Sequence, residues 1–109
     1  MPPAYWIVHV TVTDPAAYDL YRAANAGPLA KYGAEFLVRG GTQVVREGEM
    51  RPRTVVLRFP SLQAATDCYN SPEYQAAIGL RAHASLGDLS IVEGYDGPQP
   101  SAGIPPANP

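Results

Sequence analysis

The sequence predicts an α+β fold of the ferredoxin-like βαββαβ type. Three observations carry this prediction. Four stretches read as strands, segments with helical spacing follow the first and the third of them, and 109 residues are enough for one domain but too few for two. This order of elements forms a four-stranded antiparallel sheet with its helices on one face.

The first half of the predicted fold opens with a strand over residues 4–12, where apolar and polar positions alternate. Asp14 is a suitable N-cap and Pro15 a suitable first residue, so a helix is expected from Pro15. Gly27-Pro28 predicts a kink in this helix, and Gly33 predicts its end.

The second half is expected to repeat this pattern. Two strands, over residues 36–46 and 53–59, flank a polar hairpin loop over residues 47–52. Ser61 and Ser71 are N-caps of two helical pieces, and residues 89–95 form the last strand. Residues 1–95 should therefore form a single domain. Residues 96–109, rich in Pro and Gly, should form a tail that buries little surface.

Composition narrows the class of function. The net charge of -2 and the lack of an aromatic-basic motif argue against nucleic acid as a partner. Because Cys68 is the single cysteine, no intrachain disulfide can form. The sequence has no Cys/His spacing of a metal site and no phosphate loop or GxGxxG motif, so we expect neither a metal nor a cofactor. No leader-like N-terminus and no apolar run of roughly 20 residues is present. We therefore expect a cytoplasmic protein that does not use a membrane.

Five of the seven arginines lie between Tyr32 and Phe59, which concentrates positive charge in an acidic chain. The expected register places one set of side chains toward the helices: Phe36, Val38, Val44, Val55, Leu57 and Phe59. The opposite face receives Tyr5, Ile7, His9, Leu37, Arg39, Gln43, Val45, Thr54, Val56 and Arg58. That face is too apolar to stay exposed, so we expect a homodimer that encloses a small-molecule cavity between two sheets. A bulge at Gly40-Gly41 would reverse the parity of Arg39.

The candidate site residues follow from that face. Arg39 is the candidate to stabilise an oxyanion and His9 the candidate base, both as catalytic residues. The candidate ligand contacts are Tyr5, Tyr21, Arg39 and Arg58. Each has a structural alternative. The arginines could pair with nearby glutamates, His9 could be a satisfied sheet or interface residue, and the tyrosines could be core residues whose hydroxyls rim a cavity between the first helix and the sheet.

Two further residues are expected to be structural. Ser71 caps a helix in its Ser-Pro-Glu context. Arg81 falls on the packed stripe of the last helix, where a charge needs a partner, and we expect a bridge to a carboxylate such as Asp14 or Glu73 or to a strand-end carbonyl.

Several short segments of the chain follow a recognisable pattern, of which FLVRGG and YNSPEY are the most specific parts. The segments are Asp14-Pro15, Tyr18, Tyr21, Pro28, Tyr32-Gly33, residues 36–41, Glu47-Gly48, Phe59-Pro60-Ser61, residues 69–74, Arg81 and Val92-Glu93-Gly94. Through them the chain resembles the domain-of-unknown-function family 1330 over roughly residues 5–95, and Ala34 and Arg58 depart from the family pattern. The resemblance implies a dimeric α+β barrel, a superfamily that includes cofactor-independent monooxygenases, muconolactone isomerases and heme-handling proteins. It implies no particular reaction.

Two function classes remain open at this point. One is a cofactor-independent enzyme that acts on a small aromatic or carbonyl-bearing anion. The other is a non-catalytic protein that binds a ligand or a partner through the same cavity.

Overall fold

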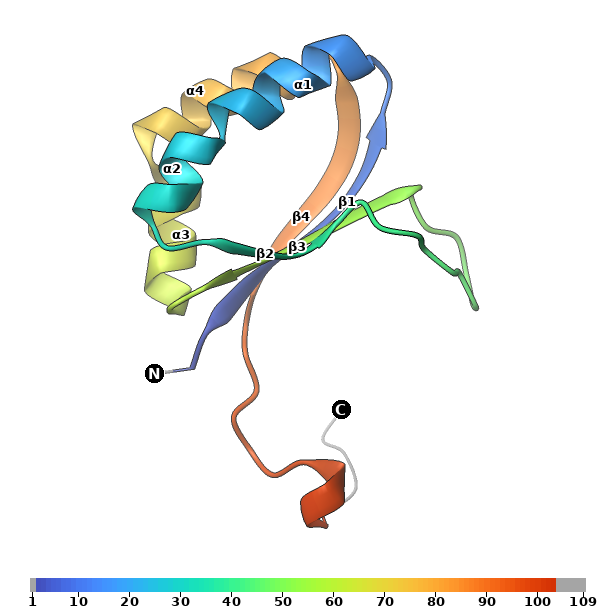
Figure 1. The fold of residues 1–109 in the computed structure, drawn as a ribbon, viewed down its shortest axis with the longest axis vertical. Coiled ribbons are helices and arrows are strands. Elements are labelled where there is room, and N and C mark those ends of the chain that lie inside the picture. Colours follow the sequence, from blue (N-terminus) through green and yellow to red (C-terminus); the bar gives the residue numbers. More distant parts are fainter. Residues whose placement is uncertain (1, 104–109) are drawn as a thin grey trace.

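A four-stranded antiparallel sheet forms one layer of the computed structural model, which describes residues 2–103. Its strand order is β2-β3-β1-β4, the ferredoxin-like order. The strands are β1 (Ala4–Val12), β2 (Glu35–Arg39), β3 (Arg53–Phe59) and β4 (Ser85–Glu93). The helices α1 (Pro15–Ala24), α2 (Ala26–Lys31), α3 (Leu62–Asn70) and α4 (Pro72–Arg81) form the second layer and lie on one face of the sheet (Figure 1). The predicted fold class is confirmed.

The helices begin where the capping residues predict. The Asp14 carboxylate accepts from the Ala17 amide at 3.2 Å, and the Ser61 hydroxyl accepts from the Ala64 amide at 3.1 Å. The break in the first helix, however, falls at Asn25 rather than at Gly27-Pro28. Pro28 lies in the first turn of α2, where an amide has no partner within the helix, so its missing N–H costs nothing.

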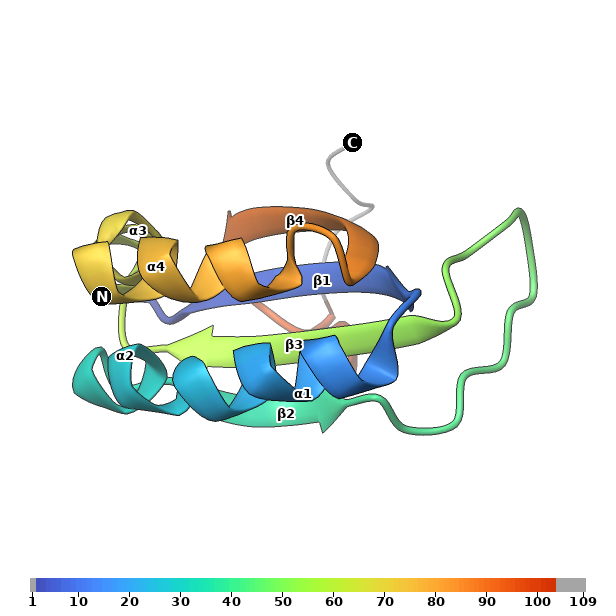
Figure 2. The ribbon, with the colours of Figure 1, turned by 90° about the horizontal axis from the view of Figure 1, so that it is seen from above.

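The strand that follows is shorter than predicted. β2 ends at Arg39 instead of Arg46, because Gly40 adopts a φ of 71° and turns the chain out of the sheet. Residues 40–52 then form a long connection without regular structure, which projects beyond the end of the sheet (Figure 2). At the other edge, β4 begins at Ser85, four residues before the predicted start.

An irregularity inside β2 reverses the predicted parity. Phe36 pairs with Leu57, but Val38 pairs with Val56 and Arg39 with Val55, so Leu37 is an extra residue in the ladder. Residues directly opposite each other share a face of the sheet. Arg39 therefore faces the helices with Val55, and Val38 faces away from them. The predicted faces of these two residues are wrong, because the bulge lies before the two glycines.

The core lies between the two layers. Trp6 is 1% exposed, its ring centre lies 4.9 Å from those of Phe59 and Tyr74, and its indole N–H donates to the Ala65 carbonyl at 3.0 Å. The buried Cys68 thiol lies 3.7 Å from the Pro28 carbonyl. These contacts join β1 to α3 and α4, and they hold the helices at the distance that leaves the pocket described below.

None of the helices α1 to α4 covers the opposite side of the sheet, here called the open face (Figure 1). It presents residues that alternate with the core positions of β1, β3 and β4, among them Tyr5, Ile7, His9, Thr54, Val56, Arg58, Leu86, Asp88 and Val92. For Tyr5, Ile7, His9, Thr54, Val56 and Arg58 this is the predicted face.

The chain after β4 leaves the two layers. Within the described part of the tail, Pro100–Ala102 form one 3-10 turn and the side chains are exposed apart from half-buried Gly97. The rest of the predicted tail, residues 104–109, lies outside the described residues. No helix among residues 2–103 is long and apolar enough to cross a membrane. The same residues contain no group of three or more His, Cys, Asp or Glu side chains placed to hold a metal ion.

Candidate functional site

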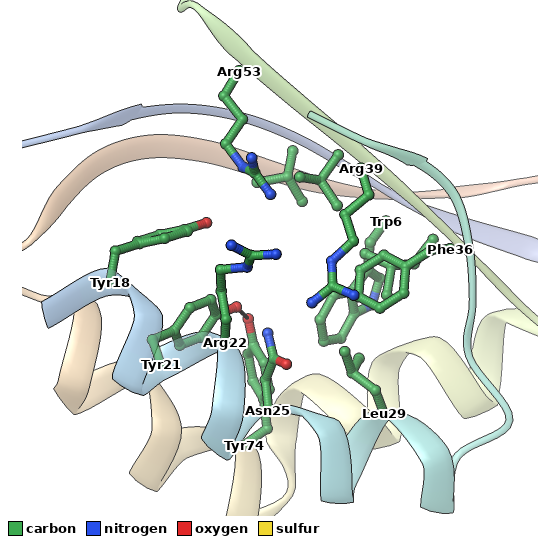
Figure 3. A pocket seen from close by; sticks show the side chains of 13 residues that line it. Trp6, Tyr18, Tyr21, Arg22, Asn25, Leu29, Phe36, Arg39, Arg53 and Tyr74 are labelled. Carbon is green, nitrogen blue, oxygen red and sulfur yellow. Dashed lines mark hydrogen bonds between the residues drawn. The ribbon is translucent and has the colours of Figure 1, made fainter. Parts of the chain in front are cut away.

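A pocket opens between the helices and the sheet, beside the edge strand β2. Its apolar wall is formed by Trp6, Leu29, Phe36 and Leu57, and its polar side chains come from α1, α4, β2 and β3. Figure 3 shows three guanidinium groups, those of Arg22, Arg39 and Arg53, around this space. We call it the arginine pocket. The pocket is partly open to solvent, and its volume is about 30 Å³, room for about two water molecules.

Each arginine reaches the pocket from a different element. Arg39 lies at the exposed mouth, with its guanidinium carbon 4.0 Å from the centre of the Phe36 ring. The guanidinium carbon of Arg53, on β3, lies 6.0 Å from the Tyr18 ring. Arg22 reaches from α1 and touches only the exposed carboxylate of Asp19, at 3.4 Å. The Nε atoms of Arg22 and Arg53 are buried without a hydrogen-bond partner in the described part of the protein.

Gly40 makes room for one of these guanidiniums. A side chain at this position would overlap the guanidinium of Arg53, and the φ of 71° would strain any other residue. The turn that ends β2 therefore also lets Arg53 pass beneath the backbone into the pocket.

Tyrosine hydroxyls and one amide complete the polar lining. Tyr21 and Tyr74 share a buried hydrogen bond of 2.6 Å, and the buried Asn25 side chain points into the pocket from the end of α1 (Figure 3). Burial raises the pKa of Tyr74 far above its usual range, and it also raises the pKa of Tyr18 although Arg53 and Arg81 act against it. These two phenols therefore stay protonated at neutral pH and can donate hydrogen bonds.

Among the described residues, no acidic side chain lines the pocket, and of its three arginines only Arg22 has a carboxylate partner, the exposed Asp19 outside the lining. Nor is any of the described lining residues His or Cys. Three cations, phenol donors and an apolar wall suit an organic anion, because guanidinium groups bind carboxylates through paired, charge-assisted hydrogen bonds. The same lining offers no side chain with a pKa near neutrality that could accept a proton.

The structure divides the predicted site between the two faces of the sheet. Arg39 and Tyr21 line the arginine pocket, whereas His9, Tyr5 and Arg58 lie on the open face. The predicted pairing of His9 with Arg39 in one cavity is therefore wrong, because the bulge in β2 carries Arg39 to the other side.

His9 belongs to a polar network on the open face. Its Nδ1 lies 3.2 Å from the Thr54 hydroxyl, which donates to the Gln43 side-chain carbonyl. Gln43 in turn donates to the Arg51 carbonyl at 2.9 Å, and Arg51 binds the Asp88 carboxylate at 3.0 Å. The contacts of Gln43 and Arg51 hold the long connection over residues 40–52 to β3 and β4.

The structure confirms the predicted role of Ser71 but not the predicted ion pair of Arg81. The Ser71 hydroxyl accepts from the Tyr74 amide at 3.2 Å and donates to the Cys68 carbonyl at 2.7 Å, as a cap does. Arg81 makes no ion pair with any described residue, and Glu73 instead lies 3.6 Å from Lys31. The predicted carboxylate bridge of Arg81 is wrong: its guanidinium carbon lies 5.2 Å from the ring of Tyr21.

The sequence held signals for three pocket residues that were not predicted. Arg53 alternates with the apolar residues Val55 and Leu57, so it must share their face. Arg22 and Asn25 follow Tyr18 at helical spacing and so share its side of α1. The predicted alternative, in which Arg39, Arg46, Arg53 and Arg58 pair with glutamates, finds no support among the ion pairs of the described residues.

The family model for a domain of unknown function, DUF1330, matches residues 3–95. The chain belongs to the DUF1330 family. No protein of the curated set matches the sequence. The match spans both faces of the sheet and all polar residues of the arginine pocket.

Solved structures show the same fold at low identity. A protein of unknown function from Rhodopseudomonas palustris superposes with a TM-score of 0.71 at 16% identity, covering 88% of this chain and 85% of the other. SnoaB from Streptomyces nogalater, described as a cofactor-independent oxygenase, gives 0.59 at 14%, with 89% and 97% covered. A protein of unknown function from Bacteroides fragilis, described as dimeric and ferredoxin-like, gives 0.58 at 16%, with 84% and 96% covered.

Proposed function

We propose that this member of the DUF1330 family binds a small aromatic or carbonyl-bearing organic anion in the arginine pocket. The observation that carries the proposal is the set of three guanidiniums without a carboxylate among the pocket's lining residues. Two of them bury an Nε–H that finds no partner in the described protein. A buried donor without a partner costs about 1–3 kcal/mol, so an acceptor from a ligand would be strongly favoured there.

The walls favour an aromatic or a flat carbonyl compound. Phe36 and Trp6 offer ring surfaces, and Arg39 is already stacked over Phe36, which leaves its guanidinium edge free for hydrogen bonds. The space of about 30 Å³ admits only a small head group. The carboxylate or enolate oxygen would therefore enter this space, and the body of the ligand would lie outside it.

A non-catalytic binding role fits the pocket better than an enzymatic one. A catalytic base must come within hydrogen-bond reach of the proton that it accepts, and His9 lies on the other face of the sheet. The second candidate, a cofactor-independent enzyme, draws support from the fold that the chain shares with SnoaB. It would require the three guanidiniums to lower the pKa of the bound substrate enough for solvent to take the proton.

We further propose that a second copy of the chain covers the open face. This face exposes Val38, Leu86 and Val92, and Ile7 and Val56 lie half-buried between them. Monomers seldom expose an apolar patch of such extent. Sedimentation at micromolar concentration should give a dimer, and a stable monomer would contradict this part of the proposal.

The binding proposal is tested with benzoate and benzamide, which differ mainly in charge. Isothermal titration at low salt should detect benzoate binding and little binding of benzamide. Arg53→Gln and Arg39→Gln should each weaken benzoate binding by about tenfold or more, since a hydrogen bond to a charged group contributes about 1.5–3 kcal/mol. Arg58→Gln, which removes an arginine from the open face, is the matched control and should change little.

Three results would overturn the proposal. Equal binding of both compounds would show that charge plays no part, and no binding of either would remove the ligand class. A loss of binding in Arg58→Gln alone would move the site to the open face. The pocket variants should fold at least as well as the parent, because they relieve repulsion between like charges.

A further inference from the structure

A second cavity lies next to the arginine pocket, between α1, α4 and the strands β1 and β4. Its volume is about 190 Å³, much more than that of the arginine pocket. Val8, Tyr18 and Tyr21 line both spaces, so these three side chains are a common wall. The far side of the second cavity is formed by Tyr69, Arg81 and Leu89.

Arg81 gives this cavity its own cationic end. Its Nε is buried without a hydrogen-bond partner among the described residues, and no carboxylate of that part of the chain pairs with it. Asp88 also contributes to the lining, but its carboxylate is bound to Arg51 at 3.0 Å and is 74% exposed. Burial lowers the pKa of Arg81, but its interactions with Tyr74 and Tyr21 outweigh burial and raise the pKa. The guanidinium is therefore charged, and no carboxylate among the described residues neutralises it.

The two tyrosines of the common wall are buried and pack against each other. Tyr21 is held by its hydrogen bond to Tyr74, and its ring packs 5.4 Å from that of Tyr18. Tyr18 stands between two cations. Burial raises the pKa of its phenol most, and Arg53 and Arg81, which belong to different cavities, both oppose that shift. The Tyr18 hydroxyl therefore interacts with the arginine of each cavity, Arg53 in one and Arg81 in the other.

We propose that the two cavities are the ends of one ligand site, and that the site takes a two-headed organic anion, a dicarboxylate with an apolar linker of moderate length. One carboxylate would bind Arg53 and its neighbours in the arginine pocket, and the other would bind Arg81. The linker would cross Val8 and Tyr21, with Tyr18 at the joint. This inference rests on the proposed anion binding and names the ligand class more closely.

The distances between the two guanidiniums and the tyrosine rings limit the length of the linker. Arg53 lies 6.0 Å from the Tyr18 ring, the two tyrosine rings are 5.4 Å apart, and Arg81 lies 5.2 Å from the Tyr21 ring. The two guanidiniums can be no farther apart than these three steps laid end to end. A dicarboxylate of moderate length can span that distance, and one as short as succinate cannot engage both ends if the groups lie near this limit.

The experiment compares linear dicarboxylates, from succinate through adipate to azelate, with monocarboxylates of the same chain length at neutral pH. The measured quantity is the ratio of the two binding constants at each length. In the parent protein we expect this ratio to peak at one length, at about tenfold or more, because a second charge-assisted contact is gained within one molecule. This length series needs no variant.

Two variants then assign the second head group. Arg81→Gln should bring the ratio to about one, and Leu89→Phe, which fills the second cavity without changing a charge, should do the same. Using both guards against a folding defect in Arg81→Gln, and Arg58→Gln should keep the parent ratio.

The outcomes separate this inference from the proposed function. Monocarboxylate binding that depends on Arg53, with no gain for a dicarboxylate of any length, would refute the two-headed ligand and leave the proposed function intact. A gain that persists in both cavity variants would also refute it. If neither benzoate nor any of the linear carboxylates binds, both proposals fail.

Discussion

The buried hydrogen bond between Tyr21 and Tyr74 allows a quantitative test of the packing between α1 and α4. The two oxygens are 2.6 Å apart, Tyr74 is fully buried and Tyr21 is 8% exposed. Tyr21→Phe leaves the Tyr74 hydroxyl without this partner, and Tyr74→Phe does the reverse. Each single change should cost about 1–2 kcal/mol of unfolding free energy, because a buried polar group is left unsatisfied.

The double variant should cost less than the sum of the two single variants. Once both hydroxyls are gone, no buried oxygen is left behind, so the two changes should be coupled by about 1 kcal/mol. Urea denaturation at one fixed protein concentration measures this coupling, and a loss of about 1 kcal/mol also lowers the melting temperature of a domain near this size by about 4 °C or more. Strict additivity of the single effects would refute the reasoning.

The alkaline limb of the stability curve gives an independent check on the same pair. Burial, followed by the neighbouring Tyr21, raises the pKa of Tyr74 above its ordinary value of 10.0. Above pH 10 the unfolded chain has lost a proton that the folded chain still holds, so the stabilisation is complete below that pH and falls as the pH rises further. The slope is at most about 1.4 kcal/mol per pH unit for this group. Tyr74→Phe should remove that contribution and flatten the curve.

Three more predictions concern Cys68, Gly40 and the C-terminal tail. Burial, helped by Glu73, raises the pKa of the Cys68 thiol from 9.0 to about 11. The unfolded chain therefore loses this proton before the folded chain does, and the parent loses unfolding free energy between pH 9 and about 11. Urea denaturation should show a smaller loss over this range for Cys68→Ala. Gly40→Ala should weaken benzoate binding several-fold by displacing Arg53, at a cost of about 1 kcal/mol in strain; unchanged titration would contradict this. Deleting residues 97–109 should change the melting temperature by no more than a few degrees, because residues 98–103 are exposed. A large fall in the melting temperature would show that the tail stabilises the fold.

Local chemistry made most of the fold predictable. Asp14, Ser61 and Ser71 cap helices through contacts that reach only three residues along the chain, so the sequence nearby contains all of the information. Alternation in β1 and β3 likewise identified their buried sides. The break at Asn25 was harder to place, because Pro28 fits without penalty in the first turn of α2.

The candidate site depended on features that are not local. The extra residue in β2 is defined by its pairing with β3, and an isolated strand gives no sign of which residue is left out of a ladder. The two glycines were the natural place to expect it, yet Gly40 ends the strand instead. This shift of one residue in register determines whether Arg39 shares a face of the sheet with His9 or with Arg53.

That single residue of register also bears on the choice between binding and catalysis. With Arg39 on the helix side, every cation of the arginine pocket lies on the face where the described lining has no base, while His9 is held by Thr54 on the other. A sheet is too thick for one substrate to reach both sets of groups. If the protein is an enzyme, the proton must therefore leave through the mouth beside Arg39 to solvent, and the pH dependence of turnover would follow the pKa of the bound substrate rather than that of a histidine. An activity that titrated near the ordinary pKa of histidine and vanished in His9→Ala would place the reaction on the open face and contradict the arginine pocket as its site.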